Sequence, residues 1–283
     1  MLSPKAEQLI HDYLNLPFTG VDGVRCPYFN NWKLRQRGQL KVLIGKGTPK
    51  EIVEETKIIS IQYHAGLFDK NGRCCLHHER ADQNADGIRK FLIDQSLGID
   101  CSGFATYVLA AHYAETRHIN LLSKIFIAPP KNFLRWAINK LRPVENVGVS
   151  VLAHNKNSEL VACLPAGMAD GMKSIDWNKI QPADFISIIK TGPQHNRNHI
   201  ILITENTGNT LRYIHARAWP SEGKYGHGVA KGEIKITKPD GTLLEQEWVE
   251  LGKVGEKNET YMIDVKMARV LEVRRMRVRM TNS

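Results

Sequence analysis

The final third of this 283-residue chain is a succession of short segments that are rich in β-branched residues or alternate apolar with polar residues. Turn formers such as Gly, Asn and Pro separate the segments, which predicts that each one is a strand. The predicted strands cover residues 183–190, 198–205, 210–217, 232–237, 259–266 and 268–280. The first third has helical patterns instead. Helices followed by a run of strands predict an α+β fold with an antiparallel sheet.

Two predicted helices near the N-terminus begin with capping residues. Ser3 can cap a helix that has Pro4 in its first position, where the missing N–H costs nothing. Thr48, with Pro49 in the first turn and Glu51 three residues later, matches a capping box. These patterns predict helices from each start, and a third helix is predicted over residues 85–97.

A fourth helix is predicted to begin at or near Cys101, in the segment "GIDCSGF". Asp100 is a good N-cap residue for it. One apolar stripe at helical spacing predicts that the helix is buried on one side. The stripe comprises Cys101, Phe104, Ala105, Val108 and Leu109. Cys101 therefore lies at the positive end of a helix, where backbone N–H groups and the helix dipole favour a thiolate and can stabilise an oxyanion.

A thiolate nucleophile needs a base and a group that orients the base. The segment "NHIILITENTGNTLRYIHAR" predicts a hairpin with the three-residue loop 206–208, because Gly at the third loop position favours that connection. This loop places Glu205 opposite Asn209 and His199 opposite His215. Residues directly opposite each other on paired strands have Cβ atoms about 4.5–5.5 Å apart. The pattern therefore predicts two neighbouring imidazoles, as in a papain-like triad.

Five segments together resemble the NlpC-type superfamily of papain-like cysteine peptidases in their order and residue types. They are "DCSGF" (100–104), "QPADFISI" (181–188), "NHIILIT" (198–204), "YIHAR" (213–217) and "GHGVAKGEIKI" (226–236). The resemblance implies that Cys101 is the nucleophile, His199 the general base and His215 the third residue. In this chain Ala183 stands where the family usually has Gly in its Pro-Gly-Asp turn.

The resemblance also implies the fold and the activity. It implies a papain-like catalytic core over residues 98–283, with an elaboration at 117–176 and an N-terminal helical extension at 1–97; one compact domain is the alternative. Members of the family mostly cleave peptide amides in peptidoglycan stem peptides through a thioester, and related branches are amidases or acyltransferases. The candidates for oxyanion or substrate contacts are Tyr28, Ser102 and Asp100.

The composition leaves a second class of function open. The net charge is +10, with a dense basic stretch in "RRMRVRM" at residues 274–280. Such a charge is typical of a protein that binds an anionic polymer, and also of a solvated basic strand face. A basic nucleic-acid-binding or scaffolding protein with an inactive papain-like fold is therefore the alternative to a hydrolase.

Cysteine usage and hydropathy suggest where the chain works. The five cysteines are odd in number and irregular in spacing, which excludes a disulfide framework and suits a reducing compartment. No apolar run approaches the roughly 20 residues that a membrane-spanning helix needs, and the N-terminus lacks the pattern of a secretory signal. We expect a cytoplasmic protein, although a wall substrate leaves export by an unrecognised route open. The oligomeric state is not predicted.

Neither a metal nor a cofactor is predicted. The run "CCLHH" at 74–78 lacks the two- to four-residue gaps between ligands that structural zinc sites use. The segment "IGKGTPKE" does not match a phosphate loop, which requires Gly, four residues and then Gly-Lys-Ser/Thr.

Overall fold

The computed structural model describes residues 1–30, 40–74, 81–128, 142–164 and 175–278. The chain divides into two compact units, which we call the sheet unit and the helical unit. The sheet unit comprises residues 1–4, 109–215 and 230–283, and the helical unit comprises residues 5–108 and 216–229. The domain boundary expected between residues 97 and 98 stays a prediction.

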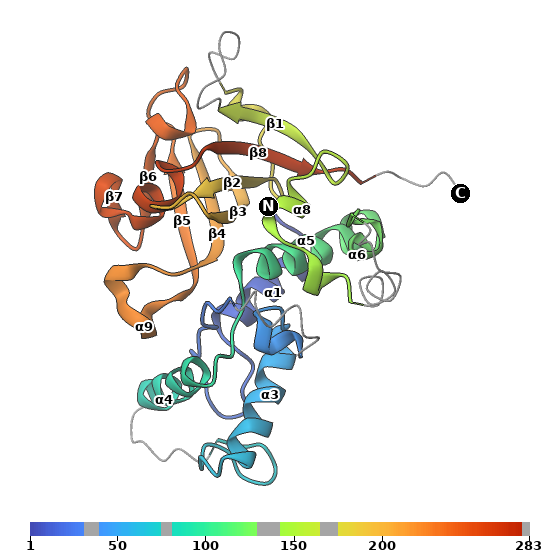
Figure 1. Cartoon of the computed structure of the whole chain (residues 1–283), viewed down its shortest axis with the longest axis vertical. Coiled ribbons are helices and arrows are strands. Elements are labelled where there is room, and N and C mark those ends of the chain that lie inside the picture. The colour runs from blue at the N-terminus through green and yellow to red at the C-terminus, as the bar shows by residue number, and fades with distance from the viewer. Residues whose placement is uncertain (31–39, 75–80, 129–141, 165–174, 279–283) are drawn as a thin grey trace. The chain divides into compact units, whose positions relative to one another are not determined.

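An eight-stranded sheet, in the order β1-β8-β2-β3-β4-β5-β6-β7, dominates the sheet unit. Antiparallel pairing joins β1 to β8, β8 to β2, β2 to β3, β3 to β4, β5 to β6 and β6 to β7. The strands are β1 (Ser158–Leu164), β2 (Phe185–Thr191), β3 (Arg197–Asn206), β4 (Thr210–Arg217), β5 (Gly228–Lys235), β6 (Glu247–Glu250), β7 (Lys253–Val254) and β8 (Val270–Met276). Figure 1 shows β8 between β1 and β2. The predicted α+β class with an antiparallel sheet is confirmed.

The core of the sheet unit lies on one face of its central strands. Alternate residues of β2, β3 and β4 point into it, as the period of two requires. Its fully or nearly fully buried members include Ile186, Ile188, Ile201, Ile203, Leu211, Tyr213, Ile234, Trp248, Leu271 and Val273. The short helix α8 (Val149–Leu152) packs against β2 and β3.

One predicted strand is wrong. Residues 259–266 form a π-helix, Thr260–Val265, instead of a strand. The Asn258 side chain accepts a hydrogen bond from Tyr261 N at 3.1 Å, and Lys266 N donates to Tyr261 O at 2.8 Å, five residues back. Local capping by Asn258 therefore outweighs the apolar pattern that predicted a strand.

Three strands lie where no strand is predicted. β1 falls inside the segment 117–176 that the resemblance treats as an elaboration, and β6 and β7 are four and two residues long. The same segment contains the short helix α6 (Leu121–Lys124), and its residues 129–141 and 165–174 lie outside the described part of the chain.

The helical unit contains the predicted N-terminal helices. They are α1 (Pro4–Leu14), α3 (Pro49–Gln62), α4 (Ala81–Asp94) and the start of α5 (Cys101–Arg117). The unit also contains α9 (Gly223–Gly226), which was not predicted. The predicted capping box of α3 is confirmed, because Glu51 N donates to Thr48 Oγ1 at 3.3 Å and Thr48 N donates to Glu51 Oε2 at 2.9 Å. The helix predicted over 85–97 begins earlier, at Ala81.

Single 3₁₀ turns connect the larger elements. They cover Lys41–Ile44, Val144–Asn146, Trp177–Lys179, Pro220–Glu222, Leu243–Glu245 and Gly255–Lys257. In the described residues no helix is both long and apolar enough to cross a membrane.

Candidate functional site

Cys101 is the first residue of α5, as predicted. Asp100 Oδ1 accepts a hydrogen bond from Gly103 N at 2.6 Å, which is the contact that an N-cap side chain makes. The Cys101 side chain is nearly buried, with 5% of the residue exposed, and the rest of the predicted apolar stripe is buried as well. Cys101 is therefore the first residue of a 17-residue helix, and the aligned peptide dipoles of that helix favour negative charge at its N-terminus.

A buried ion pair holds the residues on both sides of Cys101. Lys46 Nζ donates to Asp100 Oδ1 at 2.9 Å and to Ser102 Oγ at 2.7 Å, and Ser102 Oγ donates to Asp100 Oδ1 at 3.0 Å. The Lys46 and Asp100 side chains are 0% and 1% exposed. The side chains of Asp100 and Ser102, two of the predicted oxyanion or substrate candidates, thus contact Lys46 and each other.

Close backbone packing supports the same turn. A Cβ on Gly103 would lie 2.9 Å from Gly45 O and 3.0 Å from the Lys46 side chain, so only glycine lets the helix approach this closely. The backbone of Tyr28, the third candidate, forms a bridge with Ile99, two residues before Cys101. Tyr28 is half-buried there.

The helical unit also contains a cysteine of contrasting character. Cys26 is fully buried, and its Sγ lies 3.6 Å from Pro27 O. Burial raises the pKa of the Cys26 thiol far above its ordinary value, an effect that Arg89 only partly offsets. Cys26 is thus a packing cysteine, since a thiol that stays protonated is a poor nucleophile.

In the sheet unit, the two predicted histidines lie together. His199 Nε2 and His215 Nδ1 are 2.7 Å apart, and the rings meet edge to face. His199 lies on β3 and is 7% exposed, whereas His215 lies on β4 and is 1% exposed. The predicted contact between two imidazoles on neighbouring strands is therefore confirmed.

The register that predicted this contact is nevertheless wrong. β3 and β4 pair Leu202 with Ile214 and Ile203 with Tyr213, with a bulge before Glu205. The pairing is therefore shifted by two residues from the predicted one, and the two histidines are diagonal neighbours instead of direct partners. An even shift keeps each side chain on its face of the sheet, so both rings still lie on the same side.

A residue that the sequence analysis missed continues this arrangement. His215 Nε2 lies 3.0 Å from Glu250 Oε2, and both side chains are 0% exposed. The same carboxylate oxygen accepts hydrogen bonds from Tyr213 Oη and Thr260 Oγ1, each at 3.0 Å. The sheet unit therefore holds a buried hydrogen-bonded chain that runs from His199 through His215 to Glu250, which we call the imidazole relay.

The strand between β4 and β6 makes room for the relay. Gly232 on β5 pairs with Glu250 on β6, and a Cβ on Gly232 would lie 2.3 Å from the Tyr213 ring. Ala230, two residues earlier and on the same face, is also small and is buried. Small residues on β5 thus let side chains from β4 cross over it to reach Glu250.

A second carboxyl lies close to the relay. Asp264, in the π-helix, is 3.8 Å from Arg197, which precedes His199 by two residues on β3. Burial raises the pKa of Asp264 to about 6, the Glu250 charge adds to the rise, and Arg197 and His215 oppose it. Single-turn π-helices recur at functional sites, and this one supplies both Asp264 and the Thr260 hydroxyl.

The Pro-Ala-Asp turn has the geometry that a glycine would favour. Ala183 has a φ of 71°, and Asp184 N donates to Gln181 O at 3.0 Å. A left-handed residue at the third position is typical of a type II turn, which explains the usual Gly of the family pattern. The Asp184 carboxylate accepts two hydrogen bonds from Arg275, at 2.7 and 2.8 Å, so its role here is structural.

Two arginines of the dense basic stretch bind other groups of the chain, and residues 279–280 of the stretch lie outside the described residues. Arg274 is 7% exposed and contacts Glu272, Asn155 and Ser158. Arg275 binds Asp184 as described. These two guanidinium groups are therefore bound by groups of the chain itself.

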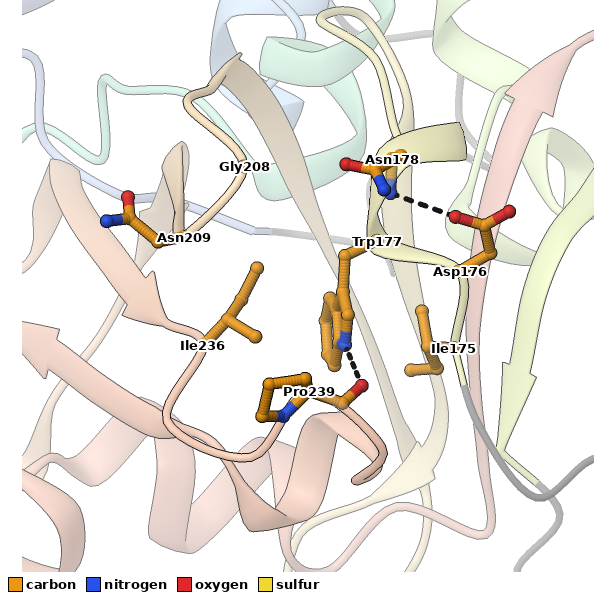
Figure 2. Close-up of a pocket in the computed structure, with 8 residues that line it drawn as sticks. All are labelled: Ile175, Asp176, Trp177, Asn178, Gly208, Asn209, Ile236 and Pro239. Atoms are coloured by element: carbon orange, nitrogen blue, oxygen red, sulfur yellow. Dashed lines mark hydrogen bonds between the residues drawn. The ribbon is translucent and has the colours of Figure 1, made fainter.

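A pocket of about 330 Å³ lies at another place in the sheet unit, between the β3–β4 turn and the loop after β5. Figure 2 shows the Trp177 indole in its wall, with Nε1 donating to Pro239 O at 2.8 Å. Neither histidine of the relay lines this pocket.

The structure describes every predicted site residue: Cys101, Asp100, Ser102 and Tyr28 belong to the helical unit, and His199 and His215 belong to the sheet unit. Glu250 lies on β6, a four-residue strand that is too short to show an alternating pattern, so no pattern in the sequence identifies it. Within the described residues no group of three or more His, Cys, Asp or Glu side chains could hold a metal ion, and the "CCLHH" run lies mostly outside them.

No family model, curated protein or solved structure matches this chain.

Proposed function

We propose that the protein is a cysteine hydrolase with a papain-like fold, which cleaves a peptide amide through a thioester. Cys101 is the nucleophile, His199 the general base and acid, and His215 the residue that orients His199. The imidazole relay carries the proposal, because a buried histidine held by a second histidine and a carboxylate is the base-and-orienter arrangement that a thiol nucleophile requires.

The proposed chemistry assigns one proton to each step. The thiol proton of Cys101 passes to His199, and the sulfur attacks the amide carbon. The protonated His199 then gives that proton to the leaving amine, which leaves a thioester for water to hydrolyse. His199 contacts His215 through Nε2, so the proposal requires the Cys101 sulfur to exchange its proton with Nδ1.

Two features of the helical unit support Cys101 as the nucleophile. It lies at the N-terminus of a long capped helix, where a thiolate is stabilised. The Lys46–Asp100 pair and the glycine contacts fix the turn on which the sulfur sits. A thioester intermediate needs a nucleophile of fixed position because misplacement by about 1 Å can cost 100-fold in rate.

The substrate class comes from the sequence resemblance, which indicates peptidoglycan stem peptides. An acyltransferase or amidase would use the same three residues and differ only in which nucleophile attacks the thioester. A wall-derived substrate fits either recycling inside the cell or export. A nucleic-acid-binding role has weaker support, since Arg274 and Arg275 are already bound within the chain.

Mass spectrometry of muropeptides incubated with the purified protein tests the proposal. We expect the wild type to cleave one amide bond and Cys101→Ala to cleave none. If the reaction is a transfer, the product should carry the added mass of the acceptor that attacks the thioester. Cys74→Ser is the matched control, because Cys74 is half-buried and outside the proposed chemistry. Equal turnover by Cys101→Ala and wild type would contradict the proposal.

A further inference from the structure

We infer that Glu250 is a positioning residue, which holds His215 in the tautomer that makes His199 a base. The inference rests on the proposed function for its catalytic consequence. The Glu250 side chain is completely buried, so it does not contact substrate. It acts through His215.

One oxygen of Glu250 is surrounded by hydrogen-bond donors. Oε2 accepts hydrogen bonds from the Tyr213 and Thr260 hydroxyls and lies within hydrogen-bond distance of His215 Nε2. A carboxylate oxygen can accept several hydrogen bonds, whereas a protonated carboxyl oxygen would itself be a donor. A buried carboxylate is tolerated when such donors surround it. Oε2 of Glu250 is therefore the acceptor in each of these three contacts.

An accepting Glu250 determines the proton positions along the relay. His215 must carry a hydrogen on Nε2 to donate to Oε2, which leaves His215 Nδ1 with a lone pair in the neutral ring. His215 Nδ1 lies 2.7 Å from His199 Nε2, so His199 must donate from Nε2. Neutral His199 then has its lone pair on Nδ1, the nitrogen that the proposed chemistry needs.

The proton balance is simple in this arrangement. When the Cys101 thiol gives up its proton, His199 Nδ1 receives it and becomes an imidazolium that keeps its Nε2 hydrogen. The leaving amine later takes the Nδ1 proton. The hydrogen on His215 Nε2 never moves, so Glu250 takes no part in the proton transfer.

Nitrogen-15 NMR of the two histidine rings reads these tautomers directly, with no need for substrate. In the wild-type protein near pH 7.5 we expect His215 to show a protonated Nε2 and an unprotonated Nδ1. Glu250→Leu removes the acceptor and should leave His215 as a mixture of both tautomers. Glu250→Gln keeps an acceptor oxygen at the same place and should keep the wild-type tautomer.

Tyr213→Phe is the matched control, since it removes another donor to the same oxygen but leaves the His215 contact. Its His215 tautomer should equal that of wild type. A Tyr213→Phe protein that loses the tautomer as fully as Glu250→Leu would overturn the inference. So would a wild-type His215 protonated on Nδ1, and that measurement is decisive even where Glu250→Leu does not fold.

Kinetics on muropeptides supply the second readout. Glu250→Leu should lower kcat on the order of 10- to 100-fold, as loss of a group that orients a histidine through a hydrogen bond commonly does. KM should stay within about twofold because Glu250 does not contact substrate. Glu250→Gln should recover most of kcat. Equal kcat in Glu250→Leu and wild type overturns the inference. A wild type with the expected tautomer but no turnover overturns the proposed function instead.

Discussion

The surroundings of Asp264 make the stability of the fold depend on pH. Burial shifts its pKa from the ordinary value of 3.8 to about 6, although its side chain is 19% exposed and faces Arg197. Folding therefore favours the protonated carboxyl. The stability from this group is complete below about pH 3.8 and is lost as the pH rises through about 6.

Asp264→Asn should flatten that dependence, because the amide resembles the protonated carboxyl at every pH. Relative to wild type, the variant should gain unfolding free energy between pH 4 and 7, by at most about 3 kcal/mol. Urea denaturation of both proteins at pH 4, 5.5 and 7 measures the difference. If the unfolding free energies of the two proteins differ by the same amount at all three pH values, folding does not raise the pKa of Asp264.

Gly232 has no side chain, which leaves space for the Tyr213 ring. A methyl group there would meet the Tyr213 ring at 2.3 Å, which forces the ring away from Glu250. We expect Gly232→Ala to cost about 1–3 kcal/mol in unfolding free energy, the usual penalty for overpacking. In a Tyr213→Leu background the same change should cost less. Additive costs in thermal or urea unfolding would rule out the steric contact.

At the scale of elements, a buried ion pair lies at the start of α5. Lys46 and Asp100 are both almost inaccessible, and Asp100 also caps the helix. Removing one partner from a buried pair leaves the other charge uncompensated. The position of Cys101 should therefore be sensitive to Lys46, which is 55 positions earlier in the chain.

Lys46→Met should destabilise the protein by about 3–5 kcal/mol. Lys41→Met is a control from the same region, because the Lys41–Glu51 pair is 40% and 37% exposed; exposed pairs contribute about 0–1 kcal/mol. Urea denaturation compares the two variants. Similar losses of unfolding free energy in both variants would mean that the buried Lys46–Asp100 pair contributes no more to stability than the exposed Lys41–Glu51 pair.

Elements defined by local chemistry could be predicted from the sequence. The capping box of α3 and the N-cap of α5 depend on residues within four positions of each other, and β2 to β4 show their pattern over seven or more residues. The His199–His215 contact was predicted despite a wrong register, because the error was an even number of residues.

The remaining errors have tertiary causes. Glu250 lies on a four-residue strand, too short to show a period, and its partners come from β4 and the π-helix. Lys46 pairs with Asp100 through a fold that brings distant segments together. The π-helix was mistaken for a strand because its apolar and β-branched residues suit either structure, and Asn258 decides between them.

At the scale of the whole molecule, the proposed enzyme has its thiol in the helical unit and its imidazole relay in the sheet unit. The proposed function requires Cys101 and His199 to act as one thiolate–imidazolium pair. An unperturbed cysteine has a pKa of about 8.5, and pairing with a protonated histidine lowers it by several pH units. The pKa of Cys101 in solution thus reports the pairing without any substrate.

The most direct test is the rate of Cys101 alkylation by iodoacetamide between pH 4 and 10, followed by peptide mass spectrometry. We predict that the wild-type sulfur reacts as a thiolate well below pH 7, and that in His199→Ala the midpoint rises toward about 8.5. His195→Ala, at an exposed histidine in the same region of the chain, should match wild type. A wild-type midpoint near that of an ordinary cysteine, unchanged in His199→Ala, would contradict the account.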